Sequence, residues 1–151
     1  SLLKALLDAR FFQSGMQSLR QIEFALFDLS IHKAAPALKA DQIQATLNEI
    51  RAQYAVLETT SYNRFQHSFS HIFAGGYAAG YYSYKWAEVL ASDAFDRFEK
   101  EGIFNTTTGK EFRQFILAVG GKDTALDAFI NFRGREPKID ALLRHQGWTN
   151  R

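Results

Sequence analysis

The sequence contains no cysteine, only two prolines and a single methionine among its 151 residues. Without cysteine the chain can form no disulfide, no thiol nucleophile and no cysteine-ligated metal site. Its formal net charge is only +2, which is too balanced to indicate nucleic acid or an anionic membrane as a partner. No apolar run reaches the 18 residues typical of a membrane-spanning helix, and no signal-peptide pattern is visible. We therefore expect a globular protein that lies in the cytoplasm and binds neither membrane nor nucleic acid.

Apolar residues recur at helical spacing along most of the chain, and few segments alternate with a period of two. The sequence therefore predicts an all-α fold with no sheet, organised as a single helical domain over residues 1–151. The expected helices cover residues 2–11, 16–33, 42–54, 77–100, 111–119, 125–132 and 137–145. Asp41 and Asp123 are the expected N-caps of two of them, and Gly134 is expected to end the helix over residues 125–132. Residues 58–70 are expected to form a loop.

The chain begins at Ser1, directly inside an apolar pattern of four leucines at positions 2, 3, 6 and 7. Natural N-termini are usually polar and frayed. We therefore expect the chain to be processed or to be a piece of a longer protein. Surface that faced the remainder would then be exposed and apolar, and could support self-association.

Four of the six tyrosines lie within residues 77–84. Tyr77, Tyr81 and Tyr84 stand at i, i+4 and i+7, so they would project from one face of the predicted helix. A phenylalanine would pack the same surface without a hydroxyl that needs a partner. The choice of tyrosine therefore favours hydroxyls that bind something, and core packing of an aromatic helix is the alternative.

Glycines surround this row of tyrosines. Gly75 and Gly76 allow a positive φ and can act as a hinge, whereas Gly80 costs a helix about 1 kcal/mol relative to alanine. Gly80 would leave open space between tyrosines or let another backbone approach. Together with His71, the segment predicts a loop and a helix face that contact a peptide-like or anionic substrate.

Other candidate sites are weaker. His67 and His71 stand at i and i+4, a spacing that can bind a metal on a helix, but no acidic third ligand lies nearby and H-E-x-x-H is absent. His32 and His67, taken singly, are expected to be surface or capping residues.

Two charged groups are expected to be solvated. Arg133, Arg135 and Lys138 form a small basic cluster that indicates an exposed corner more than a phosphate site. The acidic residues of the long helix indicate its exposed face; they are Asp93, Asp96, Glu99 and Glu101.

Residues 68–84 resemble the tyrosine–glycine loop of the thimet-oligopeptidase-like zinc metallopeptidases. Residues 19–28, 86–90, 98–105 and 132–143 are also similar to that family, so the resemblance covers nearly the whole chain. In the family, zinc is held by an H-E-x-x-H helix and a more distant glutamate, all N-terminal to the region seen here. The resemblance implies the C-terminal part of a larger helical zinc oligopeptidase that hydrolyses short peptides. This chain would form one wall of the substrate channel, and by itself it would bind no zinc and be inactive.

The resemblance also implies roles for individual residues. Tyr84 matches the tyrosine that donates a hydrogen bond to the oxyanion, and it would be catalytic together with His71. Tyr77 and Tyr81 match substrate-contacting tyrosines, and His71 and Tyr77 would contact the substrate backbone beside the scissile bond. Gly75, Gly76 and Gly80 match glycines credited with loop mobility. The spacing of six from His71 to Tyr77 departs from some members, which have five, and this leaves the path of the loop open.

A non-catalytic alternative is a helical interaction module whose aromatic face binds a partner protein. Under the peptidase interpretation the partners are short peptides and the N-terminal part of the enzyme. An upstream reading frame that encodes H-E-x-x-H would favour the peptidase, and a true start codon at this point would favour the module. Nucleic-acid binding through tyrosine stacking is disfavoured by the small net charge.

Overall fold

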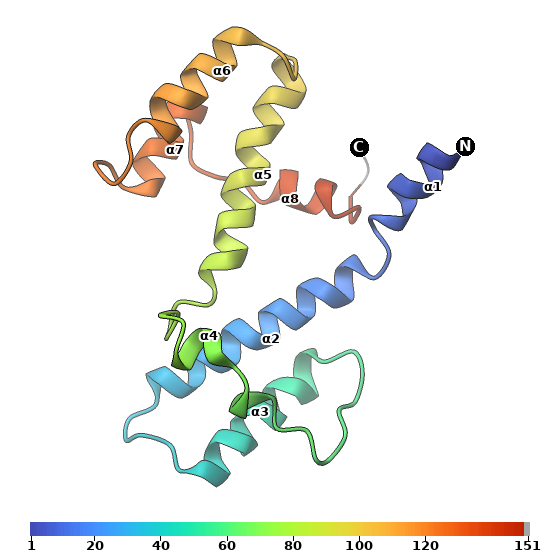
Figure 1. The fold of residues 1–151 in the computed structure, drawn as a ribbon, viewed down its shortest axis with the longest axis vertical. Coiled ribbons are helices and arrows are strands. Elements are labelled where there is room, and N and C mark those ends of the chain that lie inside the picture. The colour runs from blue at the N-terminus through green and yellow to red at the C-terminus, as the bar shows by residue number, and fades with distance from the viewer. Residues whose placement is uncertain (150–151) are drawn as a thin grey trace. The chain divides into compact units, whose positions relative to one another are not determined.

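The computed structural model describes residues 1–149, except for the side chain of Leu7. No strand occurs among these residues, so the expected all-α class is confirmed (Figure 1). The helical elements are α1 (Leu2–Ala9), α2 (Ser14–Lys33), α3 (Ala40–Tyr54), the 3₁₀ turn η1 (Phe65–His67), α4 (Ser70–Phe73), α5 (Ser83–Glu101), α6 (Thr106–Phe112), the π-helical turn η2 (Arg113–Leu117), α7 (Ala125–Arg133) and α8 (Asp140–His145).

The chain divides into two compact units, Ser1–Lys85 and Trp86–Arg151, with the boundary inside α5. Each unit has its own group of buried apolar side chains. The expectation of one helical domain over residues 1–151 stays a prediction.

The first unit is built on the packing of α2 and α3 with the segment that follows them. Phe27 of α2 and Leu47 of α3 are completely buried. Phe24 stacks on Phe65 with 4.4 Å between ring centroids, and its ring also contacts Phe69. Aromatic contacts therefore hold the segment after α3 against α2, where α4 lies in Figure 1.

The second unit has a core of aromatic side chains between α5, α6 and α7. Phe129 and Phe132 of α7 are each only 2% exposed. Phe112 lies 5.7 Å from Phe98 and 5.4 Å from Phe132, measured between ring centroids, in edge-on contacts.

The acidic residues of α5 are not an exposed face, so that prediction is wrong for its first two members. Asp93 and Asp96 are 1% and 3% exposed. Arg133 Nη2 lies 3.0 Å from Asp93 Oδ1 and 2.9 Å from Asp96 Oδ2. Glu99 and Glu101 are exposed as expected.

The predicted solvated basic corner is wrong for Arg133 and Arg135 for the same reason, whereas Lys138 is exposed as expected. The side chain of Arg133 is 7% exposed. Arg135 Nη2 lies 2.6 Å from Asp93 Oδ1, and the backbone N–H of Lys138 donates to Asp93 Oδ2 at 2.8 Å. The acidic and basic residues are partners, because a buried carboxylate is stable only where cations and N–H groups surround it.

The long helix predicted over residues 77–100 begins only at Ser83, so its first turn and a half is wrong. Residues 78–82 form turns instead, Tyr77 belongs to no regular element, and Ala79 has a positive φ of 55°. Gly80 weakens helical propensity here, and hydrogen-bond acceptors outside the helix bind the backbone N–H groups of Ala79 and Tyr81.

Several other helix ends also differ from the prediction. The N-caps are Lys39 and Thr124 in place of Asp41 and Asp123, and α8 begins three residues after Pro137. The expected loop 58–70 contains η1, and α6 starts five residues before the predicted helix 111–119. The expected stop at Gly134 is confirmed by its φ of 71°.

Candidate functional site

The predicted site residues converge on one place in the first unit, which we call the tyrosine cluster: Tyr77, Tyr81 and Tyr84 with His71. Tyr84 lies 5.0 Å from both Tyr77 and Tyr81, measured between ring centroids. The ring of His71 lies 6.3 Å from those of Tyr77 and Tyr84, and 5.8 Å from that of Tyr81. The prediction that one helix face would carry the three tyrosines is wrong, because only Tyr84 is on a helix. Turns bring the rings together instead.

The three tyrosines differ in their exposure. Tyr77 and Tyr84 are 37% and 38% exposed, whereas Tyr81 is 8% exposed. The hydroxyl of Tyr81 donates to Gln21 Oε1 at 2.9 Å, and its ring lies edge-on to Phe69. Core packing therefore describes Tyr81, while Tyr77 and Tyr84 remain within reach of a ligand.

The surroundings of Tyr81 and Tyr84 raise the pKa of both phenols. A hydrogen bond with Tyr77 is the largest cause that raises the pKa of Tyr84 above its ordinary value of 10.0, followed by desolvation and the neighbouring phenols. Burial raises the pKa of Tyr81, and nearby Arg20 partly opposes that shift. At neutral pH the hydroxyls of Tyr81 and Tyr84 therefore carry their protons.

The two glycines after α4 fold the chain back towards His71. A Cβ on Gly75 would lie 2.9 Å from the carbonyl oxygen and 3.0 Å from the Cα of His71, so only glycine fits there without a shift. Gly76 has a φ of 78°, and the next N–H, of Tyr77, donates to the carbonyl of His71 at 3.1 Å. At Gly80 no atom would lie within 3.5 Å of a Cβ, so alanine would fit.

Asp28 of α2 belongs to this site, although the sequence analysis did not single it out. It is completely buried, and its two carboxylate oxygens accept hydrogen bonds from the backbone of Ala79 and Tyr81. The available signal was an acidic residue beside Phe27 on the apolar face of the helix. His32, expected as a surface or capping residue, is in the last turn of α2, where its Nδ1 forms a hydrogen bond with the backbone carbonyl of Asp28 at 2.8 Å and also lies 2.8 Å from Asp28 Oδ1.

Residues 1–149 contain no group of three or more His, Cys, Asp or Glu side chains that could hold a metal ion. His67 is in η1 and His71 is in α4, so the two histidines do not share one helix. The described residues therefore do not fit a zinc site. None of the helices in this range is both long and apolar enough to cross a membrane.

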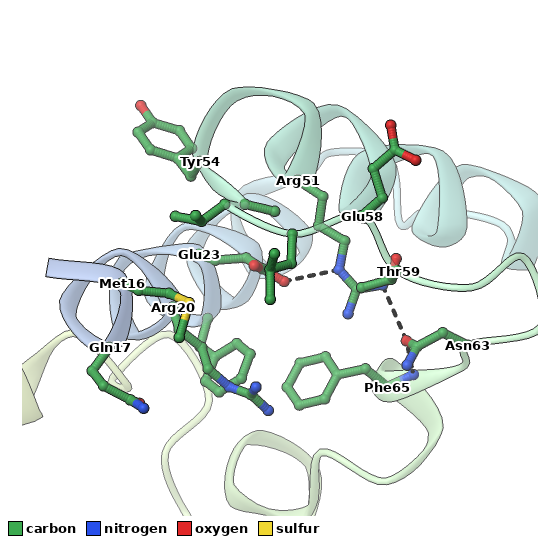
Figure 2. A pocket seen from close by; sticks show the side chains of 14 residues that line it. Met16, Gln17, Arg20, Glu23, Arg51, Tyr54, Glu58, Thr59, Asn63 and Phe65 are labelled. Atoms are coloured by element: carbon green, nitrogen blue, oxygen red, sulfur yellow. Dashed lines mark hydrogen bonds and ion pairs between the residues drawn. The ribbon is translucent and has the colours of Figure 1, made fainter. Parts of the chain in front are cut away.

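A separate hollow of about 240 Å³ lies between α2, the end of α3 and residues 55–65 (Figure 2). Its charged wall is partly neutralised, because Arg51 Nε donates to Glu23 Oε1 at 2.8 Å. Figure 2 shows Arg20 and Phe65 reaching into the hollow. Arg20 lies over the ring of Phe24, 5.2 Å from its centroid, and makes no ion pair with a described residue. No member of the tyrosine cluster lines this hollow.

Comparisons with known proteins agree with the resemblance carried by the tyrosine–glycine segment. The chain is 55% identical over 148 residues to oligopeptidase A of Haemophilus influenzae, covering 98% of this chain and 22% of that protein. It is 53% identical over 146 residues to oligopeptidase A of Escherichia coli, covering 97% and 22%. Saccharolysin of Saccharomyces cerevisiae is 34% identical over 152 residues, covering 99% and 21%.

The chain thus spans about a fifth of the length of these curated relatives. The family model that matches it, described as Peptidase family M3, covers residues 1–148. Because that match extends over nearly the whole sequence, the chain belongs to peptidase family M3.

Proposed function

We propose that the intact protein is a zinc metallo-oligopeptidase that hydrolyses short peptides, and that this chain supplies the residues that bind the peptide and stabilise the oxyanion. Family membership and the similarity to oligopeptidase A support the peptidase part. The observation that carries the role of this chain is the convergence of His71 with the two exposed phenols of Tyr77 and Tyr84.

Hydrolysis of a peptide bond passes through a tetrahedral intermediate, in which negative charge grows on the former carbonyl oxygen. A donor aimed at that oxygen lowers the barrier more than it stabilises the substrate. Tyr84 suits this role, because its raised pKa keeps the proton on the hydroxyl and its ring is 38% exposed.

Tyr77 and His71 suit contacts with the peptide backbone on either side of the reacting carbonyl. Tyr77 and Tyr84 are both exposed and their ring centroids are 5.0 Å apart, so a substrate that approaches one phenol meets the other. Tyr81, which is buried, would contribute to substrate binding by supporting the rings of Tyr84 and His71, which lie 5.0 and 5.8 Å from its own ring between centroids. Gly75 and Gly76 shape the turn that presents Tyr77.

The zinc in this proposal is held outside the described residues, because they offer no suitable ligand group. The part assigned to this chain therefore consists of hydrogen bonds to the peptide. Its partners are short peptides and the remainder of the peptidase, with exposed apolar side chains such as Leu3 and Phe104 available for contact. We also propose a cytoplasmic location, and a relative in Arabidopsis thaliana is named probable cytosolic oligopeptidase A.

The test is Tyr84→Phe in the intact protein, which removes the hydroxyl and keeps the ring. We expect kcat to fall by roughly 10²–10³-fold, as for the loss of one oxyanion donor, with a smaller change in KM. The measurement is steady-state cleavage of a short fluorogenic peptide. Tyr82→Phe is the matched control, because Tyr82 is 51% exposed and lies outside the cluster. An unchanged kcat in Tyr84→Phe, or an equal loss in the control, would remove Tyr84 from this role.

A further inference from the structure

One buried carboxylate ties the loop between α4 and α5 to α2. Asp28 Oδ1 accepts a hydrogen bond from the backbone N–H of Ala79 at 2.8 Å, and Oδ2 accepts one from Tyr81 at 2.9 Å. Asp28 is completely buried, so water does not compete for these bonds. Both oxygens are therefore used to fix a loop that lies more than fifty residues away in the sequence.

The loop needs such an anchor because its backbone is not helical. Ala79 has a φ of 55°, a left-handed conformation that is uncommon for residues other than glycine. A strained conformation of this kind persists only where the surroundings fix it. The Asp28 carboxylate supplies the fixed acceptors: one oxygen binds the N–H of Ala79 and the other binds the N–H of Tyr81.

The anchored backbone belongs to the residue at the centre of the tyrosine cluster. Tyr81 is held by α2 at both ends, at its N–H by Asp28 and at its hydroxyl by Gln21. Its ring contacts Tyr84 at 5.0 Å and His71 at 5.8 Å between centroids. A displacement of the Tyr81 backbone would therefore move the surface on which both of these rings rest.

A carboxylate is required for this arrangement. It accepts at two oxygens, whereas the amide of an asparagine offers one acceptor and one donor group. His32 Nδ1 forms a hydrogen bond with the backbone carbonyl of Asp28 at 2.8 Å and also lies 2.8 Å from Oδ1, so a polar group faces the carboxylate on the side of α2. Because an unsatisfied buried charge is costly, an aspartate on the apolar face of α2 depends on all these partners together.

We propose that Asp28 is a positioning residue for the tyrosine cluster: by binding the N–H groups of Ala79 and Tyr81, it sets where the phenols of Tyr77 and Tyr84 meet the peptide. This inference rests on the proposed function for its consequence in catalysis. The hold on the loop itself is measurable without any activity.

The first experiment is residue-resolved amide hydrogen exchange by NMR on Asp28→Asn in this chain. We expect the amides of Ala79 and Tyr81 to exchange about tenfold faster than in the wild type, as for the loss of a buried hydrogen bond, while the amides of α3 keep their rates. Asp41→Asn, at an exposed carboxyl of the same residue type, should change none of them. Unchanged exchange of Ala79 and Tyr81 in Asp28→Asn would overturn the proposal.

A second measurement needs no variant and decides the case if Asp28→Asn does not fold. In the wild-type chain, a long-range HNCO experiment should show couplings from the amide nitrogens of Ala79 and Tyr81 to the carboxyl carbon of Asp28. Helix hydrogen bonds in the same spectrum provide the internal standard. If those standards are detected and both Asp28 couplings are absent, the proposal is wrong.

The catalytic consequence is tested in the intact peptidase with a double-mutant cycle. Asp28→Asn should lower kcat/KM by up to about 10²-fold, because a small misplacement of positioned groups is costly. If Asp28 acts through the cluster, adding Asp28→Asn to Tyr84→Phe should cost less than it does in the wild type, a coupling that mere destabilisation would not produce.

The outcomes separate the two proposals. If Tyr84→Phe lowers kcat and Asp28→Asn does not, Asp28 is not a positioning residue. If the loop amides exchange faster but Tyr84→Phe leaves kcat unchanged, the proposed function fails while the hold of Asp28 on the loop stands.

Discussion

Each hydroxyl of the tyrosine cluster has a different partner. Tyr81 donates to Gln21 Oε1 at 2.9 Å inside the protein, whereas the exposed phenols of Tyr84 and Tyr77 lie against each other, with 5.0 Å between their ring centroids. A peptide that reaches the cluster can therefore exchange partners with the Tyr77–Tyr84 pair, but not with Tyr81. This distinction predicts which phenols change their ionisation when a neighbour is altered.

Tyr77→Phe should lower the pKa of Tyr84 towards its ordinary value of 10.0, because the hydrogen bond with Tyr77 is the largest cause of the upward shift. A raised folded-state pKa favours the neutral phenol, so its contribution to stability is present below pH 10 and is lost as the pH rises through the folded-state value. NMR titration of ring carbons, with Tyr84 assigned, measures the shift. Tyr82→Phe should leave the pKa of Tyr84 unchanged. A Tyr84 pKa that Tyr77→Phe does not move would contradict this account.

At the scale of elements, the turn after α4 depends on the absence of one side chain. Gly75→Ala would place a Cβ 2.9 Å from the carbonyl oxygen of His71, and the atoms it meets are backbone. We expect the substitution to lower the free energy of unfolding by about 1–3 kcal/mol, as overpacking does, and to shift the His71 and Tyr77 resonances.

Gly80→Ala is the matched control in the same loop, because no atom would lie within 3.5 Å of its Cβ. Its effect should stay within about 1 kcal/mol, since a gain from the less flexible unfolded chain accompanies the change. Urea unfolding measures both variants. Equal effects of the two substitutions would show that close approach at Gly75 is not what fixes the turn.

The sequence pattern correctly predicted the helix features that depend on residues close by in the sequence. The apolar stripe of α2 and the stop at Gly134 were both visible in the sequence, because they depend on neighbours within a turn or two. The start of α5 was not visible, since it is set by Asp28 bonds to Ala79 and Tyr81 from more than fifty residues away. The membership of the site was predicted from residue types and family resemblance, whereas its geometry depends on these distant contacts.

The same limit applies to the charged residues of the second unit. In the sequence, Asp93 and Asp96 belong to the acidic residues of the long helix, and Arg133 belongs to a separate basic cluster. Each group was therefore predicted to be solvated. Their pairing joins positions 37 and 40 residues apart, beyond the reach of any helical periodicity. A buried charge pair of this kind can be recognised only when the positions of α5 and α7 in the fold are known.

At the scale of the whole molecule, the carboxyls whose pKa is lowered lie together in residues 93–101. Burial alone would raise the pKa of Asp93 and Asp96, but hydrogen bonds and nearby cations outweigh it: Arg135 and Lys138 act on Asp93, and Lys100 and Arg144 on Asp96. Glu99 is lowered by His145 and Arg144 against the same opposing burial. Acid should therefore destabilise the chain through its second unit.

We expect the free energy of unfolding to fall as the pH drops below about 4, because these groups have folded-state pKa values below their ordinary 3.8 to 4.5. Their stabilisation is complete above those ordinary values and is lost as the pH passes down through the folded-state values. Both tryptophans, Trp86 and Trp148, belong to the second unit, so their fluorescence during urea unfolding at pH 7 and pH 3 reports the change.

Asp93→Asn at pH 7 should also lower the free energy of unfolding, without any change of pH. It removes the charge that Arg133 and Arg135 surround, and breaking a buried pair costs about 3 kcal/mol. Asp140→Asn, at an exposed carboxyl in the first turn of α8, should cost less than about 1 kcal/mol. If the buried carboxylates are the source of acid sensitivity, the stability of Asp93→Asn should also depend less on pH between 7 and 3 than that of the wild type. A full wild-type pH dependence in Asp93→Asn would instead place the sensitivity in groups other than Asp93.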